Sequence, residues 1–224
     1  SSFATPVLGL LGVPGLMAIA SPLPATIPAA LVGAASYARR DEVEWPLARW
    51  SIYGGVPGTI GGALLSRVVG GRPLLIASGV VLGVIGLRIL RPIPQQERIR
   101  GRARRQRGFV IPVAALIGVF TGMLANGGGF LLVPLYVVVL GLTMPESAGT
   151  SLVVIAVLAI PTLVSHWALG HIRWSVAGAF ALGAVPGALA GSVFTPHIPQ
   201  ESLRKAFGLL LVAFASFFVV QLAI

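Results

Sequence analysis

Long apolar stretches without charge dominate the chain. Five of them contain no Asp, Glu, Lys or Arg, and each approaches or exceeds the about 20 residues that a helix needs to cross a bilayer core. Two shorter stretches, 50–66 and 73–87, are flanked by arginines that can extend to the lipid headgroups, so they are further candidate crossings. This pattern predicts an all-α, polytopic membrane protein. The five uncharged windows are 1–38, 108–145, 147–172, 174–200 and 206–224.

Hydrophobic runs, interrupted by glycine and proline, divide these stretches into helices. The segment 130–142 is short: at about 1.5 Å per residue it reaches only about 20 Å of a core about 30 Å thick. A re-entrant segment and a tilted crossing therefore both remain open for it. The first half of the chain predicts helices at about 3–15, 17–38, 46–67 and 72–90, and the second half at about 109–126, 130–142, 147–168, 174–194 and 203–222.

The two halves match one another at an offset of 129 residues. At that offset YGGVPGTIGGALL (53–65) lies on LGAVPGALAGSVF (182–194), and the alignment continues without a gap. The matched pairs include Trp45/Trp174, Gly54/Gly183, Val56/Val185, Pro57/Pro186, Gly58/Gly187, Gly62/Gly191, Leu23/Leu152, Leu74/Leu203, Gly79/Gly208 and Gly12/Gly141. We therefore predict two homologous transmembrane repeats, 1–90 and 109–224, whose relative orientation stays open. Such duplication is the usual build of secondary transporters.

One segment of the second repeat has no counterpart in the first. The stretch FVIPVAALIGVFTGMLANGGG begins at Phe109, and the matching position lies ahead of Ser1. We therefore expect the native protein to contain a further N-terminal helix that precedes this chain.

The positive charge is concentrated between the repeats. The chain carries a net charge of +10, and the connector 91–108 holds seven arginines and one glutamate. By the positive-inside rule this connector is cytoplasmic, and it can also contact anionic lipid headgroups. No aromatic residue lies between the arginines, which argues against nucleic-acid binding. The absence of cysteine from the sequence excludes disulfides and thiolate metal ligands.

The stretch ANGGGFLLVP (125–134) interrupts an apolar helix. Glycine costs about 1 kcal/mol in a helix interior and proline about 3, so local stability is given up here. Irregular backbone at membrane depth is tolerated where it is buried in protein or lines a cavity, and a restarted helix would direct free N–H groups, and its positive dipole end, into the break. The alternative is a tightly packed turn. The predicted anion-binding residues here are Asn126, Gly127, Gly128 and Gly129.

A second helix start follows in TMPESAGTSL (143–152). Thr150 and Ser151 supply hydroxyl donors, and Ser21 matches Thr150 in the first repeat, so all three join the predicted substrate site. The alternative is that these hydroxyls only bond carbonyls of their own helix. Glu146 is interpreted as a structural acid at the helix start or as a proton-coupling group, and His166 as an interfacial histidine.

Two further motifs concern helix packing and chemistry. Gly58/Gly62 and Gly187/Gly191 have GxxxG spacing, which predicts close helix contacts. Three scattered histidines and one acid within the long second-half apolar region assemble no metal site and no nucleophile–base pair, and no Walker loop occurs. We therefore predict neither an enzyme nor a bound cofactor or metal.

The segment NGGGFLLVPLYVVVLGLTMPESAGTSLVVI (126–155), followed by GHIRW (170–174) and LGAVPGALAGSVF (182–194), resembles the TauE/SafE family of membrane permeases. The resemblance implies export of small anions that contain oxidised sulfur, without choosing among sulfite, thiosulfate and organosulfonates. The first repeat departs from the pattern, with ASPL where the second has GTSL.

Together these features predict a permease of the bacterial inner membrane that exports such an anion by alternating access between the repeats. An interior-negative potential contributes about 2.3 kcal/mol per charge per 100 mV to anion export, so export needs no coupling ion. The expected partners are the anion, the lipid bilayer and a second copy in a homo-oligomer. The alternatives are a non-transporting membrane subunit that anchors partners and a passive anion channel.

Overall fold

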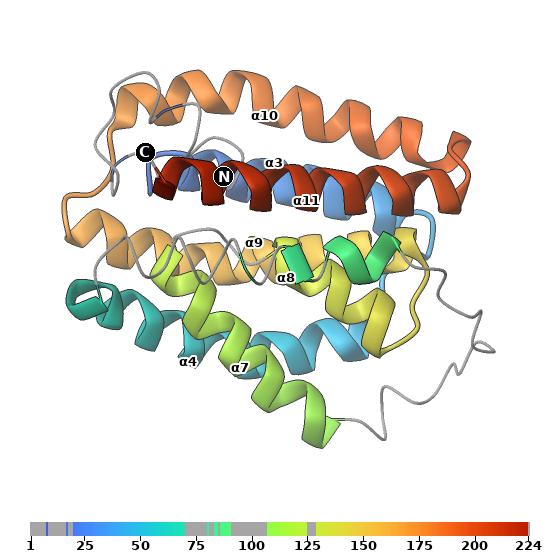
Figure 1. Cartoon of the computed structure of the whole chain (residues 1–224), viewed down its shortest axis with the longest axis horizontal. Helices are drawn as coiled ribbons and strands as arrows, with labels where there is room; N and C mark the ends of the chain where they lie inside the picture. The colour runs from blue at the N-terminus through green and yellow to red at the C-terminus, as the bar shows by residue number, and fades with distance from the viewer. Residues whose placement is uncertain are drawn as a thin grey trace.

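Helices make up every regular element of the described chain. The computed structural model describes residues 20–69, 86–90, 107–124 and 129–223, with the single positions 8, 17, 80, 83 and 84. No strand occurs within these residues, so the all-α prediction is confirmed for them. The elements are α3 (Leu23–Ala38), α4 (Trp45–Val69), α7 (Arg107–Leu124), α8 (Gly129–Pro134), the π-helix η1 (Leu135–Val139), α9 (Met144–Ala168), α10 (Trp174–Phe194), the 3₁₀-helix η2 (Thr195–His197) and α11 (Gln200–Ala223) (Figure 1).

The predicted boundaries agree with the structure to within about three residues in most helices. The bounds of α10 are those predicted, whereas α3 begins at Leu23, six residues later than predicted, with Pro24 in its first turn, where proline is well tolerated. The predicted helices 3–15 and 72–90 fall mostly outside the described residues, as does the connector up to residue 106.

Helices related by the offset of 129 run in opposite directions. In α3 and α9, Gly33 lies against Leu152 and Tyr37 lies against Gly149, so these two helices are antiparallel. The helices α4 and α9 are parallel, because their contacts run from the Glu44–Thr150 hydrogen bond to the contact of Gly55 with Leu158.

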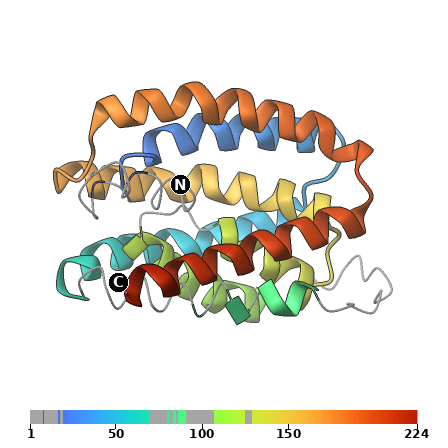
Figure 2. The ribbon, with the colours of Figure 1, turned by 45° about the horizontal axis from the view of Figure 1, so that its top comes forward.

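The helix α10 runs parallel to α3. The contacts advance from Ser21 with Arg173 to Tyr37 with Thr195. Accordingly α4, α7 and α9 point one way and α3 and α10 the other, and Figure 2 shows α10, α3 and α9 stacked side by side. If the halves are repeats, this arrangement makes them inverted ones.

Glycines let α4 and α7 pack backbone against backbone. A Cβ at Gly58 would collide with the carbonyl oxygen of Ala115, and small residues at this spacing allow such an approach. The predicted packing role of Gly58 and Gly62 is thereby confirmed. The same collision would occur for Gly54 with Ile111, Gly62 with Val119, Gly118 with Gly55 and Gly122 with Thr59.

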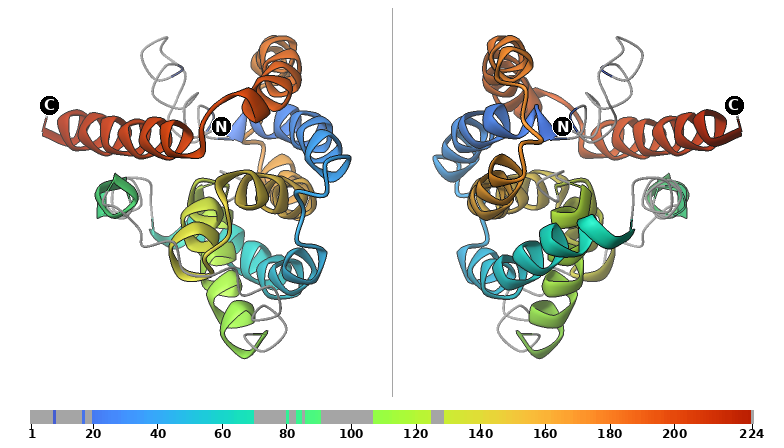
Figure 3. Two further views of the ribbon diagram at one scale, coloured as in Figure 1. Left: turned by 90° about the vertical axis from the view of Figure 1, so that its right-hand side faces the viewer. Right: turned by 90° about the vertical axis from the view of Figure 1, so that its left-hand side faces the viewer.

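The corresponding prediction for Gly187 and Gly191 of α10 is wrong within the described residues. A Cβ built at either glycine, or at Gly183, meets no described atom within 4 Å. The reason is positional: α10 contacts α3 through its other side and lies at the edge of the helical array, while α11 projects away from it (Figure 3).

The chain between α7 and α9 crosses the molecule rather than returning to the same end. The last turns of α7 and α9 lie together, since the His166 ring contacts the carbonyl oxygen of Gly122 at 3.2 Å. The helix α9 begins at the opposite end, so residues 125–143 must pass back along its length. The helical part, 129–139, supplies only about 16 Å of this path at about 1.5 Å per residue. The segment is thus a crossing built on a short helix.

Two of the described helices are long and apolar enough to span a membrane, α9 and α10 with its extension to His197. Shorter apolar helices cover Leu23–Ala38 and Val110–Met123. Trp167 and Trp174 are exposed and in edge-to-face contact at one end of this pair, with ring centroids 6.2 Å apart. Exposed tryptophans at helix ends are typical of membrane–water interfaces.

Candidate functional site

Thr150 joins the α3–α4 loop to the central helix α9. The backbone N–H of Glu44, which directly precedes α4, donates a hydrogen bond of 2.9 Å to its Oγ1. Thr150 is completely buried, so this loop amide is held in place at a helix boundary. A buried amide left without its acceptor would cost about 1–3 kcal/mol.

Ser21 makes the equivalent contact at the other end of the molecule. The N–H of Arg173, the N-cap residue of α10, donates a hydrogen bond of 2.9 Å to Ser21 Oγ, and Ser21 is also completely buried. At the offset of 129, Ser21 is the counterpart of Thr150 and Arg173 is the counterpart of Glu44. The donor belongs to the first half in the Glu44–Thr150 bond and to the second half in the Arg173–Ser21 bond. We call the Glu44–Thr150 and Arg173–Ser21 hydrogen bonds the first and second hydroxyl clasps.

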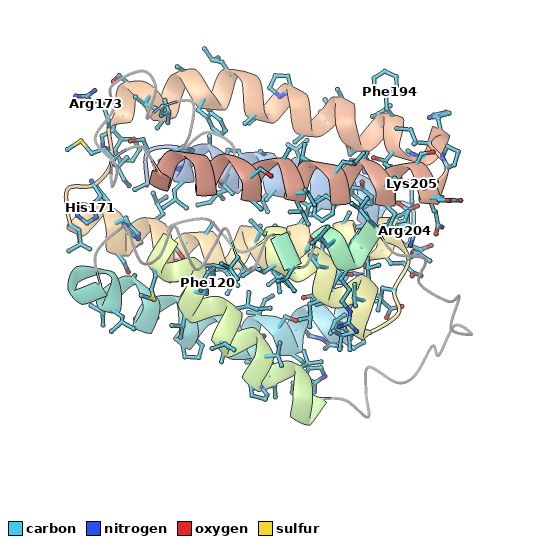
Figure 4. All side chains as sticks on the ribbon, viewed as in Figure 1. Phe120, His171, Arg173, Phe194, Arg204 and Lys205 are labelled. Carbon is cyan, nitrogen blue, oxygen red and sulfur yellow. The ribbon has the colours of Figure 1, made fainter. Side chains whose placement is uncertain are left out.

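The loops that carry the two clasps have the same backbone form. The N–H of Glu42 donates to the carbonyl of Tyr37 at 3.1 Å, and the N–H of His171 donates to that of His166 at 3.0 Å. Each loop also contains one residue with positive φ, Asp41 at 56° and Gly170 at 70°. Figure 4 shows His171 and Arg173 at one end of the molecule and Arg204 and Lys205 at the other.

The structure does not bring all the predicted site residues together. Ser21 and Thr150 lie at opposite ends of α9, because its run from Thr150 to Ala168 alone covers about 27 Å at about 1.5 Å per residue. Ser151 is buried beside Thr150 and donates to the carbonyl of Ala148 at 2.9 Å. Gly129 is the first residue of α8. Asn126, Gly127 and Gly128 lie outside the described residues.

The first turn of α9 is closed by its own side chains. Thr143 and Glu146 form a capping box: the N–H of Glu146 donates to Thr143 Oγ1, and the N–H of Thr143 donates to Glu146 Oε2 at 3.0 Å. A carboxylate therefore already occupies the positive end of this helix dipole, which disfavours a substrate anion in that turn. This geometry favours the structural interpretation of Glu146. Ser147, in the same turn, is buried, and its Oγ has no hydrogen-bond partner within the described structure.

Removal of the cap should weaken the fold without altering transport chemistry. Thr143→Ala is expected to lower the free energy of unfolding by about 1 kcal/mol, because it leaves two first-turn partners unsatisfied. Glu146→Gln keeps an acceptor at the cap and should cost less. Thermal unfolding of the purified variants in detergent measures both effects. A pH-dependent loss of transport in Glu146→Gln at unchanged stability would instead indicate proton coupling.

Two buried polar contacts were not predicted from the sequence. Tyr136 of η1 donates its O–H to Ser51 Oγ of α4 at 2.7 Å, and both residues are completely buried. His166 Nε2 faces the Gly122 carbonyl, which can only accept, while its Nδ1 lies 3.2 Å from Nδ1 of His171. A tyrosine two residues after Pro134, in an otherwise apolar run, was the available signal for the first contact.

A cavity of about 500 Å³ lies beside α8 and η1. Side chains of α7, α8 and η1 form almost all of its wall, and that wall is apolar apart from Arg88. It is therefore not a polar pocket for a small hydrophilic anion. Among the residues that the structure describes, no group of three or more His, Asp or Glu side chains could hold a metal ion.

Comparison with protein families decides the class of the protein. Residues 1–218 match the family described as "Sulfite exporter TauE/SafE". This chain belongs to the TauE/SafE family. The match extends over both halves and over the glycine turn, so the resemblance found in the motifs is confirmed.

Curated relatives of this chain are named as probable membrane transporters. A "Probable membrane transporter protein" of Xylella fastidiosa (strain Temecula1 / ATCC 700964) is 26% identical over 192 residues, which cover 82% of this chain and 72% of the relative. In Bacillus subtilis (strain 168), "Probable membrane transporter protein YunE" is 23% identical, covering 79% and 69%, and "Probable membrane transporter protein YjnA" is 21% identical, covering 91% and 85%. No solved structure matches the chain significantly. TauE/SafE membership and these names support a membrane transporter.

Proposed function

We propose that this protein is a multi-pass permease that moves a small anion containing oxidised sulfur out of the cell by alternating access between two inverted halves. The observation that carries the proposal is the reciprocal pair of hydroxyl clasps at opposite ends of the α3–α9 pair. A two-fold relation between duplicated halves produces such exchanged contacts. Glu44 meets Thr150, and Arg173, the counterpart of Glu44, meets Ser21, the counterpart of Thr150.

Other contacts follow the same rule and support the inverted repeat. Gly83 lies against Ala215, and Gly86 lies against Val212. Ala215 is the counterpart of Gly86 at the offset of 129, and Val212 is the counterpart of Gly83. Inverted repeats with a site between them are the common architecture of secondary transporters.

Each clasp closes one end of the molecule in this proposal. The first holds the start of α4 to α9, and the second holds the start of α10 to the start of α3. A single hydrogen bond contributes about 0.5–1.5 kcal/mol net, and water can replace the partner when an end opens. Each clasp can therefore break and re-form at low cost. In this proposal, a protein with both clasps formed is closed at both ends.

The substrate assignment rests on family membership and on the broken crossing. The described helix α7 ends at Leu124 and α8 begins at Gly129, and in the sequence Gly127 and Gly128 lie between these two positions. We propose that backbone amides of this turn bind the oxyanion without a fixed positive charge. Thr150 lies toward the opposite end of α9 from the last turn of α7, so in this proposal its hydroxyl acts through the first hydroxyl clasp and not on the same anion. Export then follows the interior-negative potential, at about 2.3 kcal/mol per charge per 100 mV.

The charge distribution supports an orientation in the bacterial inner membrane. Loop residues Arg39 and Arg40 lie at the end where α7 and α9 begin, and so do Arg204 and Lys205 of α11. Arg173 lies at the opposite end. By the positive-inside rule the former end is cytoplasmic, which agrees with the placement of the arginine-rich connector directly before α7.

Flux measurements test the function. The protein in proteoliposomes should give saturable flux of sulfite, thiosulfate or a short organosulfonate, with sulfate as the comparison anion. Thr150→Val, which removes the hydroxyl, should reduce that flux at least about tenfold, equivalent to about 1.4 kcal/mol, whereas Thr150→Ser should retain most of it.

Other outcomes would point to the alternatives. Ohmic anion conductance without saturation would identify a passive channel. Absence of flux for every anion, with loss of a co-purifying partner after replacement of the connector arginines by glutamine, would identify an anchoring subunit.

A further inference from the structure

The cavity beside α8 and η1 is elongated along the helices that form it. Its lining on α7 extends from Leu116 to Met123, about 10 Å at about 1.5 Å per residue. On the crossing it extends over a similar length, from Leu131 in α8 to Val139 in η1. The volume of about 500 Å³ falls within the range of about 300–1,000 Å³ that is usual for small-molecule pockets. Its shape therefore suits a long, narrow ligand.

The wall of this cavity is apolar inside and at its rim. Every lining residue except Arg88 is apolar. Leu116 is 70% exposed and Val139 is 46% exposed, so hydrophobic side chains also border the cavity on the outside. In a membrane protein, exposed apolar side chains of this kind lie against the hydrocarbon of the bilayer. A hydrocarbon chain can therefore enter the cavity from the bilayer without contact with water.

Arg88 lies near the level of the lipid headgroups. Its segment is antiparallel to α11, because Leu90 lies against Gly208 while Gly86 lies further along that helix. Gly208 comes three residues after Lys205, the last charged residue of α11. Arg88 is therefore within about 8 Å of Lys205 along the axis of α11, at about 1.5 Å per residue. At this depth a guanidinium can extend to the headgroups while its aliphatic part contacts apolar side chains.

Arg88 brings a single positive charge to this apolar wall. No hydrogen bond or ion pair joins its guanidinium to another residue in the described part of the chain. The planar guanidinium is suited to two parallel hydrogen bonds with a phosphate. A ligand that combines a phosphate with a hydrocarbon chain therefore matches both the charge and the surface of the cavity.

We propose that this cavity binds one acyl chain of an anionic phospholipid whose phosphate contacts Arg88. The lipid is a bound component and not the transported anion, so the proposal goes beyond the transport function. Charge complementarity selects an anionic headgroup over a zwitterionic one. The connector 91–108, which begins three positions after Arg88, adds seven arginines and one glutamate, and such basic segments attract anionic lipids.

Lipid retention by the purified protein tests the site directly. The protein, delipidated in detergent and titrated with dioleoyl phosphatidylglycerol, should retain one lipid per chain in native mass spectrometry. Arg88→Gln should weaken this retention at least about tenfold, because the charged contact to the phosphate is lost. Val138→Trp, which adds bulk to the cavity wall and leaves Arg88 in place, should also weaken it.

The matched control is Arg49→Gln. Arg49 is an exposed arginine of α4 that does not line the cavity, so the same change of charge there should leave retention unchanged. Equal retention by Arg88→Gln and Arg49→Gln, or equal retention of dioleoyl phosphatidylcholine by the unsubstituted protein, would overturn the proposal. Displacement of the phospholipid by equimolar oleate would assign the cavity to a free fatty acid and would also overturn it. None of these results depends on anion flux.

Discussion

Alanine at Gly62 should strongly destabilise the protein, whereas alanine at Gly61 should not. A Cβ at Gly62 would overlap the carbonyl group and Cα of Val119, which are backbone atoms that no rotamer change can move. The two helices would have to separate along the whole contact. We expect Gly62→Ala to lower the free energy of unfolding by about 1–3 kcal/mol, the usual cost of overpacking. Thermal or denaturant unfolding in detergent measures it.

Gly61 is the control for this prediction. It lies in the same helix turn, and no described atom falls within 4 Å of a Cβ built at this position. Because alanine favours helix over glycine by about 1 kcal/mol, Gly61→Ala should leave stability unchanged or raise it slightly. Equal losses for the two variants would show that helix propensity, not contact with α7, governs this region.

A disulfide across either hydroxyl clasp should block transport. The hydrogen bond of 2.9 Å from the Glu44 N–H to Thr150 Oγ1 keeps the two Cα atoms within about 6.8 Å, which a disulfide can bridge. Glu44→Cys with Thr150→Cys should therefore cross-link on oxidation and hold that end closed. Flux in proteoliposomes should fall to background on oxidation and return after reduction to the level of the Thr150→Cys single variant.

The second clasp supplies the matched experiment. Arg173→Cys with Ser21→Cys places the same cross-link at the opposite end, and it should also stop flux. The single-cysteine variants show the effect of losing each hydroxyl without a cross-link. If either oxidised pair transports at the rate of its reduced form, that end does not open during transport and the alternating mechanism is wrong.

Much of the helical framework follows from hydrophobic length. The bounds of α10 could be predicted because a charge and a tryptophan mark its start and a proline follows its end. Hydrophobicity predicts the start of α9 at about residue 147, three residues after its observed start at Met144. The polar residues of its capping box belong to the helix, and a boundary set by hydrophobicity alone excludes them.

The relative direction of the halves could not be predicted. It depends on whether residues 125–143 cross the molecule, and hydrophobic length is ambiguous for a segment whose helical part covers about half of a bilayer core. The structure shows the directions of the individual helices through contacts between distant residues, such as Gly33 with Leu152. No local pattern contains that information.

The candidate site shows the same limit. The sequence predicts Thr150 and Ser21 as site residues from their hydroxyls and from the offset of 129 that relates them. Their hydrogen-bond partners are backbone amides of two loops, and a backbone amide has no signal in the sequence. The Tyr136–Ser51 contact joins η1 to α4 across 85 positions of sequence, so composition could not reveal it.

The main-chain origin of both clasp donors leaves the side chains at their positions unconstrained. One loop has glutamate at position 44 and the other has arginine at position 173, yet the same bond forms in both. The charge of the two loops can therefore differ without loss of either hydrogen bond. Neither a peptide amide nor a hydroxyl titrates in the physiological range, so the two bonds themselves contain no group that changes its charge with pH.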